Sequence, residues 1–292
     1  MTSAMLRKLG FGSSDRLVIT HADDVGMCQA TLSAFAELVD YGLVSCGSLM
    51  VPCPWFPAAR TFCREHPIVD VGVHLTLTSE HKTYRWGPIS TRDPESGLLD
   101  SEGYFPRRSA DVQERGNQRA VLYELRSQLE LALVEGIDVS HLDSHMGSVL
   151  HSRFLSGYVD LALSHQLPLV VPRLDVQGHA FSADLVCATN AALDHLERDG
   201  VPIFDRILGL PLDQTNIRLD TAKATLAQTV PGLNLLIIHP AVDCQELRTI
   251  TPNWSARDSD YQTFLRPELR EYIRNAGIQI IGFRVLRDAM RN

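Results

Sequence analysis

Apolar runs alternate with amphipathic segments along most of this chain. Short runs rich in Val, Ile and Leu are typical of buried strands, and apolar residues at spacings of three and four are typical of helices. The pattern predicts strands at residues 16–21, 45–51, 69–75, 138–144, 167–171, 203–207, 233–239 and 279–283. It predicts helices between them, at residues 29–41, 111–135, 153–165, 182–198, 215–229 and 261–275.

Repeated alternation of strands and helices predicts an α/β fold with mostly parallel strands. About seven or eight strand–helix units suit a distorted (β/α) barrel. A doubly wound open sheet is the alternative. Its nucleotide-binding form is disfavoured, because neither Gly-x-Gly-x-x-Gly nor a phosphate-binding loop follows the first strand. We expect residues 1–292 to form one domain, with a core at about 16–285 and an inserted loop at 79–109.

The segment 79–109 interrupts the alternation, since it is polar and rich in Pro and Gly. Loops of this length are uncommon unless they are functional or disordered. Its aromatic residues are Tyr84, Trp86, Tyr104 and Phe105. Two roles are open for them: stacking on a sugar ring, or anchoring the loop to the body of the protein. Trp86 is the candidate for a contact near a substrate.

Composition narrows the class of protein. The formal net charge of the 292 residues is -8, which argues against nucleic acid or an anionic membrane as a partner. The six cysteines form no Cys-x-x-Cys pair, and we expect reduced, mostly buried thiols. No signal-peptide core opens the chain, and no apolar run approaches the ~18 residues of a membrane span. We therefore expect a cytoplasmic enzyme with a small-molecule substrate.

Two adjacent carboxylates, Asp23 and Asp24, follow the first predicted strand. Their charges repel, so the pKa of one rises unless a cation or a hydrogen-bond donor intervenes. A metal ion would allow one carboxylate to bind the cation while the other acts as a base. The alternative is that one of them only caps a helix, as Asp often does.

Further polar side chains stand at the ends of later strands. They are His74, His239, and the group His141, Asp143 and His145. The three residues of that group are two apart, so their side chains point to the same side of a strand. In a barrel these strand ends converge on one face. One carboxylate and two imidazoles would leave positions for water and substrate, as in catalytic zinc sites. A buried polar network without a metal is the alternative.

These motifs, taken together, resemble the YdjC-like carbohydrate deacetylases, the family of chitooligosaccharide deacetylase. The resemblance runs from about residue 16 to about residue 285. It rests on Ala22-Asp23-Asp24-Val25-Gly26, Gly72-Val73-His74-Leu75-Thr76-Leu77-Thr78, His141-Leu142-Asp143-Ser144-His145, His239-Pro240 and Arg257-Asp258-Ser259-Asp260.

The resemblance implies a distorted (β/α) barrel that removes acetyl groups from N-acetylated sugars with a divalent metal, Zn²⁺ or Mg²⁺. Matched by motif, the metal ligands would be Asp24, His74 and His145. Asp23 would be the catalytic base and His239 the general acid. Family members also suggest a homodimer.

Other residues would support the site. Arg173 falls where the family has a strand-end Arg that orients the base, here Asp23, and Asp143 would orient a histidine ligand. His141, His21, Trp86 and Arg257 would lie close to the metal or the substrate.

The chain departs from the family pattern at several positions. The family usually has Asn at the position of His21 and Phe at that of Val25, and it continues with further histidines where this chain has Met146. These changes affect the substrate more than the chemistry. Two other functions stay open: a barrel metal hydrolase acting on a phosphoester, lactam or cyclic amide, and a non-catalytic carbohydrate-binding protein.

Overall fold

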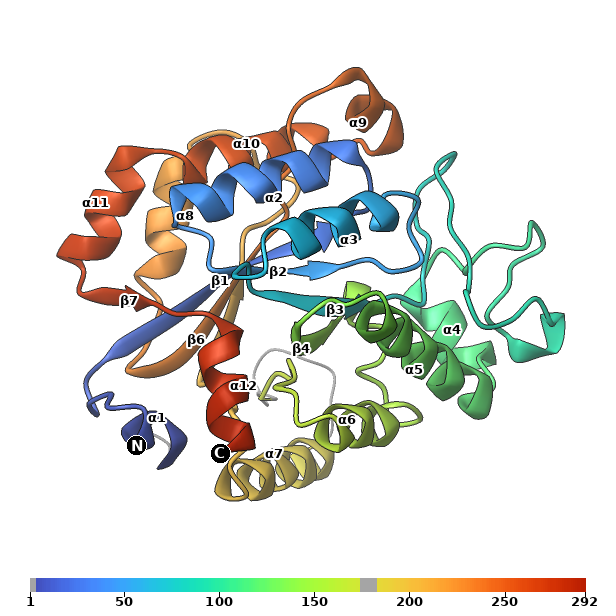
Figure 1. The fold of residues 1–292 in the computed structure, drawn as a ribbon, viewed down its shortest axis with the longest axis horizontal. Helices are drawn as coiled ribbons and strands as arrows, with labels where there is room; N and C mark the ends of the chain where they lie inside the picture. The colour runs from blue at the N-terminus through green and yellow to red at the C-terminus, as the bar shows by residue number, and fades with distance from the viewer. Residues whose placement is uncertain (1–3, 174–182) are drawn as a thin grey trace.

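A seven-stranded parallel sheet forms the centre of the protein, and helices lie around it (Figure 1). The computed structural model describes residues 4–173 and 183–292. The strands are β1 (Arg16–Val25), β2 (Cys46–Leu49), β3 (Val71–Leu75), β4 (Val139–Ser144), β5 (Arg206–Gly209), β6 (Gly232–Ile238) and β7 (Ile278–Ile280). The predicted α/β fold with mostly parallel strands is confirmed.

The strands follow the order β4-β3-β2-β1-β6-β5, and β7 also pairs with β1. Strand β6 pairs with β1 along residues 16–22, so β7 and β2 share the other edge of β1. The predicted strand at 167–171 is reduced to a parallel bridge between Leu142 and Leu169. Among the described residues no pairing joins β4 to β5, so the sheet stays open there and no closed barrel is formed by these strands.

Helices alternate with the strands as predicted, although some helices begin or end at other residues than predicted. They are α1 (Ala4–Lys8), α2 (Gln29–Tyr41), α3 (Phe56–Glu65), α4 (Ser109–Arg115), α5 (Gln118–Val134), α6 (Leu155–Ser164), α7 (Ala183–Arg198), α8 (Arg218–Leu226), α9 (Gln245–Ile250), α10 (Trp254–Phe264), α11 (Pro267–Asn275) and α12 (Phe283–Arg291).

Two of the predicted helices each cover parts of two observed helices. The prediction at 111–135 is wrong at Gly116, because the Asn117 side chain accepts hydrogen bonds from the backbone N–H groups of residues 119 and 120 and starts α5. The prediction at 261–275 is wrong near Pro267, which lacks a backbone N–H and stands at the start of α11.

Hydrophobic side chains pack on both faces of the sheet. The larger cluster lies between the strands and the surrounding helices. A smaller cluster includes Leu17 and Ile19 of β1, Leu235 of β6 and Phe283 of α12. Side chains on a strand alternate between faces, so the face of β1 that carries Leu17 and Ile19 continues into His21 and Asp23. An apolar layer therefore lies directly beneath the polar strand ends.

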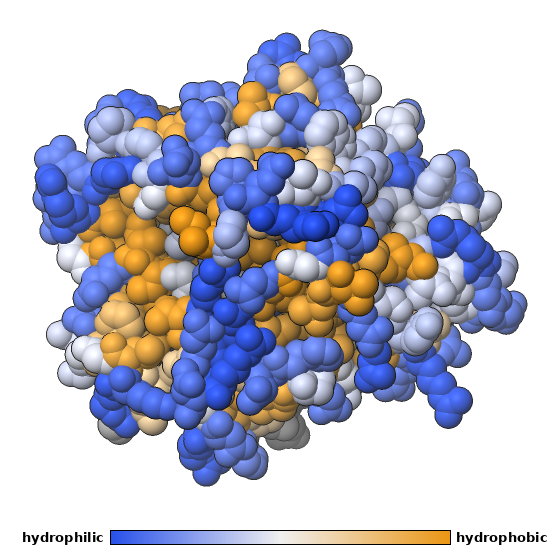
Figure 2. Space-filling model, in the orientation of Figure 1, coloured by the Kyte–Doolittle hydropathy of each residue, from blue (hydrophilic) through white to orange (hydrophobic). Residues whose placement is uncertain are grey.

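Helices α1 and α12 lie side by side, close to the two ends of the chain (Figure 1). In the same view hydrophilic residues occupy most of the rim, and apolar residues show between them (Figure 2). Among the described helices, none combines the length and apolar character that crossing a membrane requires. The five described cysteines carry free thiols, four of them buried, and Cys187 lies outside the described side chains.

Candidate metal and catalytic site

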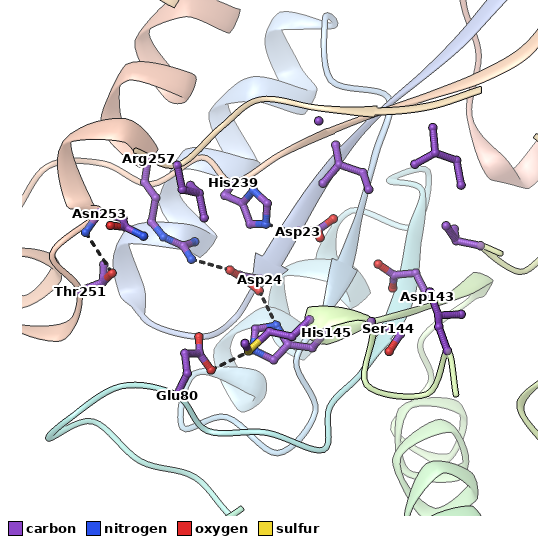
Figure 3. Close-up of a pocket in the computed structure, with 18 of the residues that line it drawn as sticks. Asp23, Asp24, Glu80, Asp143, Ser144, His145, His239, Thr251, Asn253 and Arg257 are labelled. Atoms are coloured by element: carbon purple, nitrogen blue, oxygen red, sulfur yellow. Dashed lines mark hydrogen bonds and ion pairs between the residues drawn. The ribbon is translucent and has the colours of Figure 1, made fainter. Parts of the chain in front are cut away.

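A cavity of about 680 Å³ opens at the carboxyl ends of the strands. Asp23, Asp24, His145 and His239 lie on one side of it, from the ends of β1, β4 and β6 (Figure 3). The lining also has an apolar part, which includes Val170, Pro172, Ile207, Leu208, Leu212 and Ile237. The site therefore combines a dense group of titratable residues with a hydrophobic wall.

A β-bulge at the end of β1 brings two consecutive carboxylates to this cavity. The pairing of β1 with β2 shifts register between Ala22 and Val25, and Asp24 has a φ of 63°. This left-handed conformation is uncommon for residues other than Gly, although Asp is among the side chains that tolerate it. Bulges re-aim side chains and occur often beside active sites. Here the bulge turns Asp24 towards His74, which Asp23 also approaches.

Asp24, His74 and His145 direct one ligand atom each towards a common point. His145 Nδ1 lies 3.1 Å from Asp24 Oδ1, and His74 Nε2 lies 3.4 Å from the same oxygen. The two imidazole nitrogens are 3.3 Å apart. Asp24 Oδ1 is buried and has no hydrogen bond of good geometry within the described part of the chain. A carboxylate and two imidazoles arranged in this way fit a divalent cation.

Each of the two imidazoles is backed by a carboxylate on its far nitrogen. His74 Nδ1 lies 2.7 Å from Asp143 Oδ2, and His145 Nε2 lies 3.0 Å from Glu80 Oε2. Donation of the far N–H fixes the tautomer and leaves the lone pair of the near nitrogen available to a metal. Asp143 is therefore placed as predicted, beside a histidine. Burial opposes ionisation of Glu80, yet His145 lowers the pKa of that carboxyl to about 2.

Glu80, which stands in the loop after β3, was not predicted from the sequence. One signal was available, since Glu80 follows the motif 72–78 by only two residues. Ser48 of β2 was also missed, and its hydroxyl donates to Asp143 Oδ2 at 3.2 Å.

Arg257 of α10 neutralises the other side of Asp24. Its Nη2 lies 2.8 Å from Asp24 Oδ2, and both side chains are buried. Burial opposes ionisation, but the nearby Arg257 and His145 hold the pKa of Asp24 well below its usual range. Asp24 is therefore charged and ready to bind a cation through Oδ1.

The two oxygens of Asp23 have separate surroundings. Oδ1 lies 2.7 Å from His21 Nδ1, and Oδ2 lies 3.6 Å from His239 Nε2. Burial lowers the pKa of His239, so its imidazole is neutral at pH 7. The backbone N–H of His239 donates to Asp260 Oδ2 at 3.0 Å, and Asp260 is held in turn by Arg218. The end of β6 is thereby fixed beside Asp23.

A family model for YdjC-like protein matches residues 17–275, which is most of the chain. The chain belongs to the YdjC-like family. A carbohydrate deacetylase of Thermus thermophilus is 30% identical over 286 residues, covering 98% of this chain and 99% of that protein. A carbohydrate deacetylase of Brevibacillus brevis is 26% identical over 268 residues, covering 91% and 98%.

This YdjC-like protein shares its fold with a distant protein whose crystal structure is known. That protein is a proposed cellobiose-phosphate cleavage protein of Enterococcus faecalis V583. The TM-score is 0.78 at 24% identity, over 94% of this chain and 99% of the other. The likeness therefore extends over most of the fold.

Arg173 does not lie where the family resemblance implies. In this YdjC-like protein its guanidinium lies 2.6 Å from Asp194 and 2.9 Å from Glu197, both on α7. These carboxylates hold it at a partly exposed position. His21 makes the short contact with Asp23 instead. The expectation that Arg173 orients Asp23 is therefore corrected.

Trp86 is only 3% exposed and packs inside the protein. Its indole N–H donates to the carbonyl of Thr78 at 2.8 Å, and its ring lies edge-on to His145 with centroids 6.3 Å apart. Tyr84 donates its hydroxyl to the carbonyl of Met27 at 2.8 Å. Of the two roles left open for these aromatics, the geometry is that of anchoring the loop.

Proposed function

We propose that this YdjC-like protein is a metal-dependent deacetylase that hydrolyses the acetamide of an N-acetylated sugar and releases acetate. One observation carries the proposal: two carboxylate-backed imidazoles face a buried carboxylate, and a second carboxylate lies beside them. Relatives that align over nearly the whole chain are named carbohydrate deacetylases, which supports the substrate class.

Asp24, His74 and His145 would hold the cation. Imidazole ligands suit zinc, whereas magnesium prefers oxygen ligands, so this donor set favours Zn²⁺. When bound, the cation would polarise the acetyl carbonyl and lower the pKa of a water molecule towards ~7.

Asp23 is the base in this proposal. His21 holds Oδ1, so Oδ2 is the oxygen that faces the cavity and accepts the proton of the attacking water. A positioned general base contributes roughly 10²- to 10⁴-fold to a rate. The other oxygen keeps its hydrogen bond while this proton arrives.

His239 completes the transfer of the proton. Its Nε2 is 3.6 Å from Asp23 Oδ2, and its neutral form can accept the proton that Asp23 has taken. Protonated His239 then donates to the leaving amine, which would otherwise depart as an anion. One proton thus moves from water to Asp23, to His239 and to the amine, and the active-site residues return to their starting state.

The test is release of acetate from N,N'-diacetylchitobiose and a panel of N-acetyl sugars. The protein is freed of metal with EDTA and then supplied with zinc or magnesium. We expect acetate only with added metal, and more with zinc. A folded, metal-loaded protein that releases phosphate from phosphoesters but no acetate would contradict the proposal. Sugar binding without turnover under every metal would contradict it as well.

A further inference from the structure

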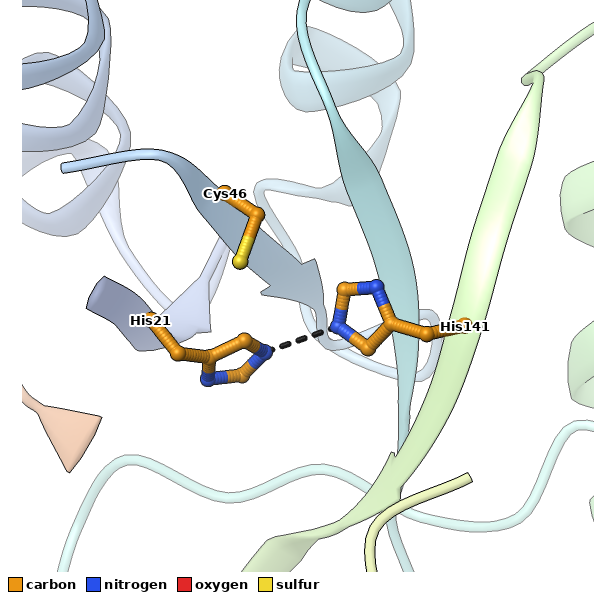
Figure 4. Close-up of side chains that lie close together, drawn as sticks. All are labelled: His21, Cys46 and His141. Carbon is orange, nitrogen blue, oxygen red and sulfur yellow. Dashed lines mark hydrogen bonds between the residues drawn. The ribbon is translucent and has the colours of Figure 1, made fainter. Parts of the chain in front are cut away.

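A chain of buried hydrogen bonds runs from Asp23 into the interior of the sheet. His21 Nδ1 lies 2.7 Å from Asp23 Oδ1, and His21 Nε2 lies 2.8 Å from His141 Nε2 (Figure 4). His141 Nδ1 lies 2.8 Å from Ser140 Oγ. His21, His141 and Ser140 are fully buried. The base is therefore connected to a line of polar groups that solvent does not reach.

Packing leaves the ring of His141 little freedom. It stacks on Phe283 with the centroids 3.8 Å apart and the planes at 15°. A β carbon at Gly72 would lie 2.5 Å from His141 Nε2, so only a glycine leaves room for the ring. The imidazole that holds His21 is thus fixed by its surroundings.

The donors and acceptors of these hydrogen bonds can be assigned in order, starting from Ser140. The hydroxyl of Ser140 donates its single proton to the carbonyl of Val71 at 3.0 Å, so it accepts from His141 Nδ1. His141 is neutral, because burial holds its pKa well below the usual range. Its Nε2 therefore accepts the proton of His21 Nε2.

His21 then needs a second proton, on Nδ1, to bond to the carboxylate of Asp23. The hydrogen bonds thus favour an imidazolium paired with that carboxylate. The pKa of His21 agrees with this order. Burial lowers it, but the hydrogen bond that His21 donates to Asp23 and the charge of Asp143 outweigh burial and raise the pKa above the usual value.

We propose that His21, held by His141, is the positioning residue for the base Asp23. It holds Oδ1 by a short hydrogen bond and so keeps Oδ2 beside His239 and the cation ligand His74. This inference rests on the proposed function.

Three variants of the full-length, zinc-loaded protein test the proposal: His21→Ala, His21→Asn and Cys46→Ala. Cys46 lies beside both imidazoles (Figure 4), and its thiol donates to the carbonyl of Thr20 at 3.9 Å. Cys46→Ala therefore disturbs packing in the same layer and leaves the chain of hydrogen bonds intact.

For His21→Ala we expect kcat to fall about 10- to 100-fold, with KM and bound zinc close to wild type. His21→Asn should recover part of the loss, because its amide can still donate to Asp23. Cys46→Ala should keep kcat within about twofold of wild type, because Cys46 makes none of the hydrogen bonds that link Asp23 to Ser140 and should be only weakly coupled to them.

Several results would overturn the inference. Wild-type kcat in His21→Ala, or a loss confined to KM or to bound zinc, would remove the positioning role. A second equivalent of zinc in the wild type, lost in Cys46→Ala, would make His21, Cys46 and His141 a metal site instead.

If the wild type releases no acetate, the proposed function fails, and a second measurement still tests the inference. Nitrogen NMR of the imidazole of His21 should show protons on both ring nitrogens. A neutral ring would overturn the assignment without any measurement of activity.

Discussion

Asp23 and Asp24 are consecutive residues, yet both carboxylates approach Nε2 of His74, at 3.8 and 3.4 Å. In a regular strand neighbouring side chains point to opposite faces. The bulge after Ala22 and the φ of 63° at Asp24 remove that alternation at this one point. A single dipeptide can therefore supply both a ligand for the cation and a base for the reaction.

Asp24→Asn should abolish most metal binding while the chain keeps its fold. Asn tolerates the left-handed conformation of residue 24, but its neutral amide is a poor partner for a cation and for Arg257. We expect zinc affinity to fall more than about 100-fold, beyond the range typical of residues that only support a ligand. Competition with a zinc-sensitive dye measures the affinity. Asp160→Asn, on an exposed turn of α6, is the control, and equal zinc affinity in both variants would exclude Asp24 as a ligand.

Asp23→Asn should leave the metal in place and remove the base. The amide cannot take a proton at Oδ2, so kcat should fall by roughly 10²- to 10⁴-fold. Acetate release is measured on protein whose zinc content has been determined. If zinc is lost together with activity, Asp23 would be a ligand rather than a base.

Metal binding should raise the thermal stability of the protein. The three cation ligands come from separate parts of the sheet: Asp24 from β1, His74 from β3, and His145 from the segment directly after β4. A cation that binds only the folded state stabilises that state. Free zinc at about 100 times its Kd should add about 2.7 kcal/mol to the free energy of unfolding. Thermal unfolding with EDTA and with zinc measures the difference. The same shift in Asp24→Asn would place the stabilising ion elsewhere.

Much of the site could be predicted from sequence, because its residues stand where apolar runs stop. Asp24, His74 and His145 each follow or end a buried strand, and parallel strands bring such ends to one edge. The structure places these three together. Apolar runs indicated most of the strands, and the family resemblance selected these three residues among the polar side chains at the strand ends.

The other contacts of the site depend on loop and backbone conformations, which a pattern of apolar residues does not predict. Glu80 lies in an irregular loop, where no repeat of apolar residues predicts the direction of a side chain. Arg173 was matched to the family by its position at a strand end, but α7 offers it two closer carboxylates. The bulge at Asp24 is likewise a backbone feature without a residue pattern of its own.

Trp86→Phe should lower stability and leave substrate binding unchanged. The indole N–H donates to the carbonyl of Thr78, and the loss of that donor leaves a buried acceptor unpaired. Such a loss costs about 1–3 kcal/mol. We expect a lower urea midpoint for unfolding with an unchanged KM. A raised KM at full stability would instead indicate that Trp86 contacts the sugar.

Gly72→Ala should lower both the stability of the protein and its kcat. The added methyl would lie 2.5 Å from His141 Nε2, and the ring cannot retreat because Phe283 stacks on it at 3.8 Å. Overpacking of this kind costs about 1–3 kcal/mol, and displacement of His141 would also release His21 from its fixed orientation. We therefore expect a lower urea midpoint together with a reduced kcat. Gly12→Ala is the matched control, because its added carbon would meet Asp15 at an ordinary 3.7 Å. A variant at residue 72 that is destabilised but keeps full kcat at low temperature would show that the ring of His141 can move without disturbing Asp23.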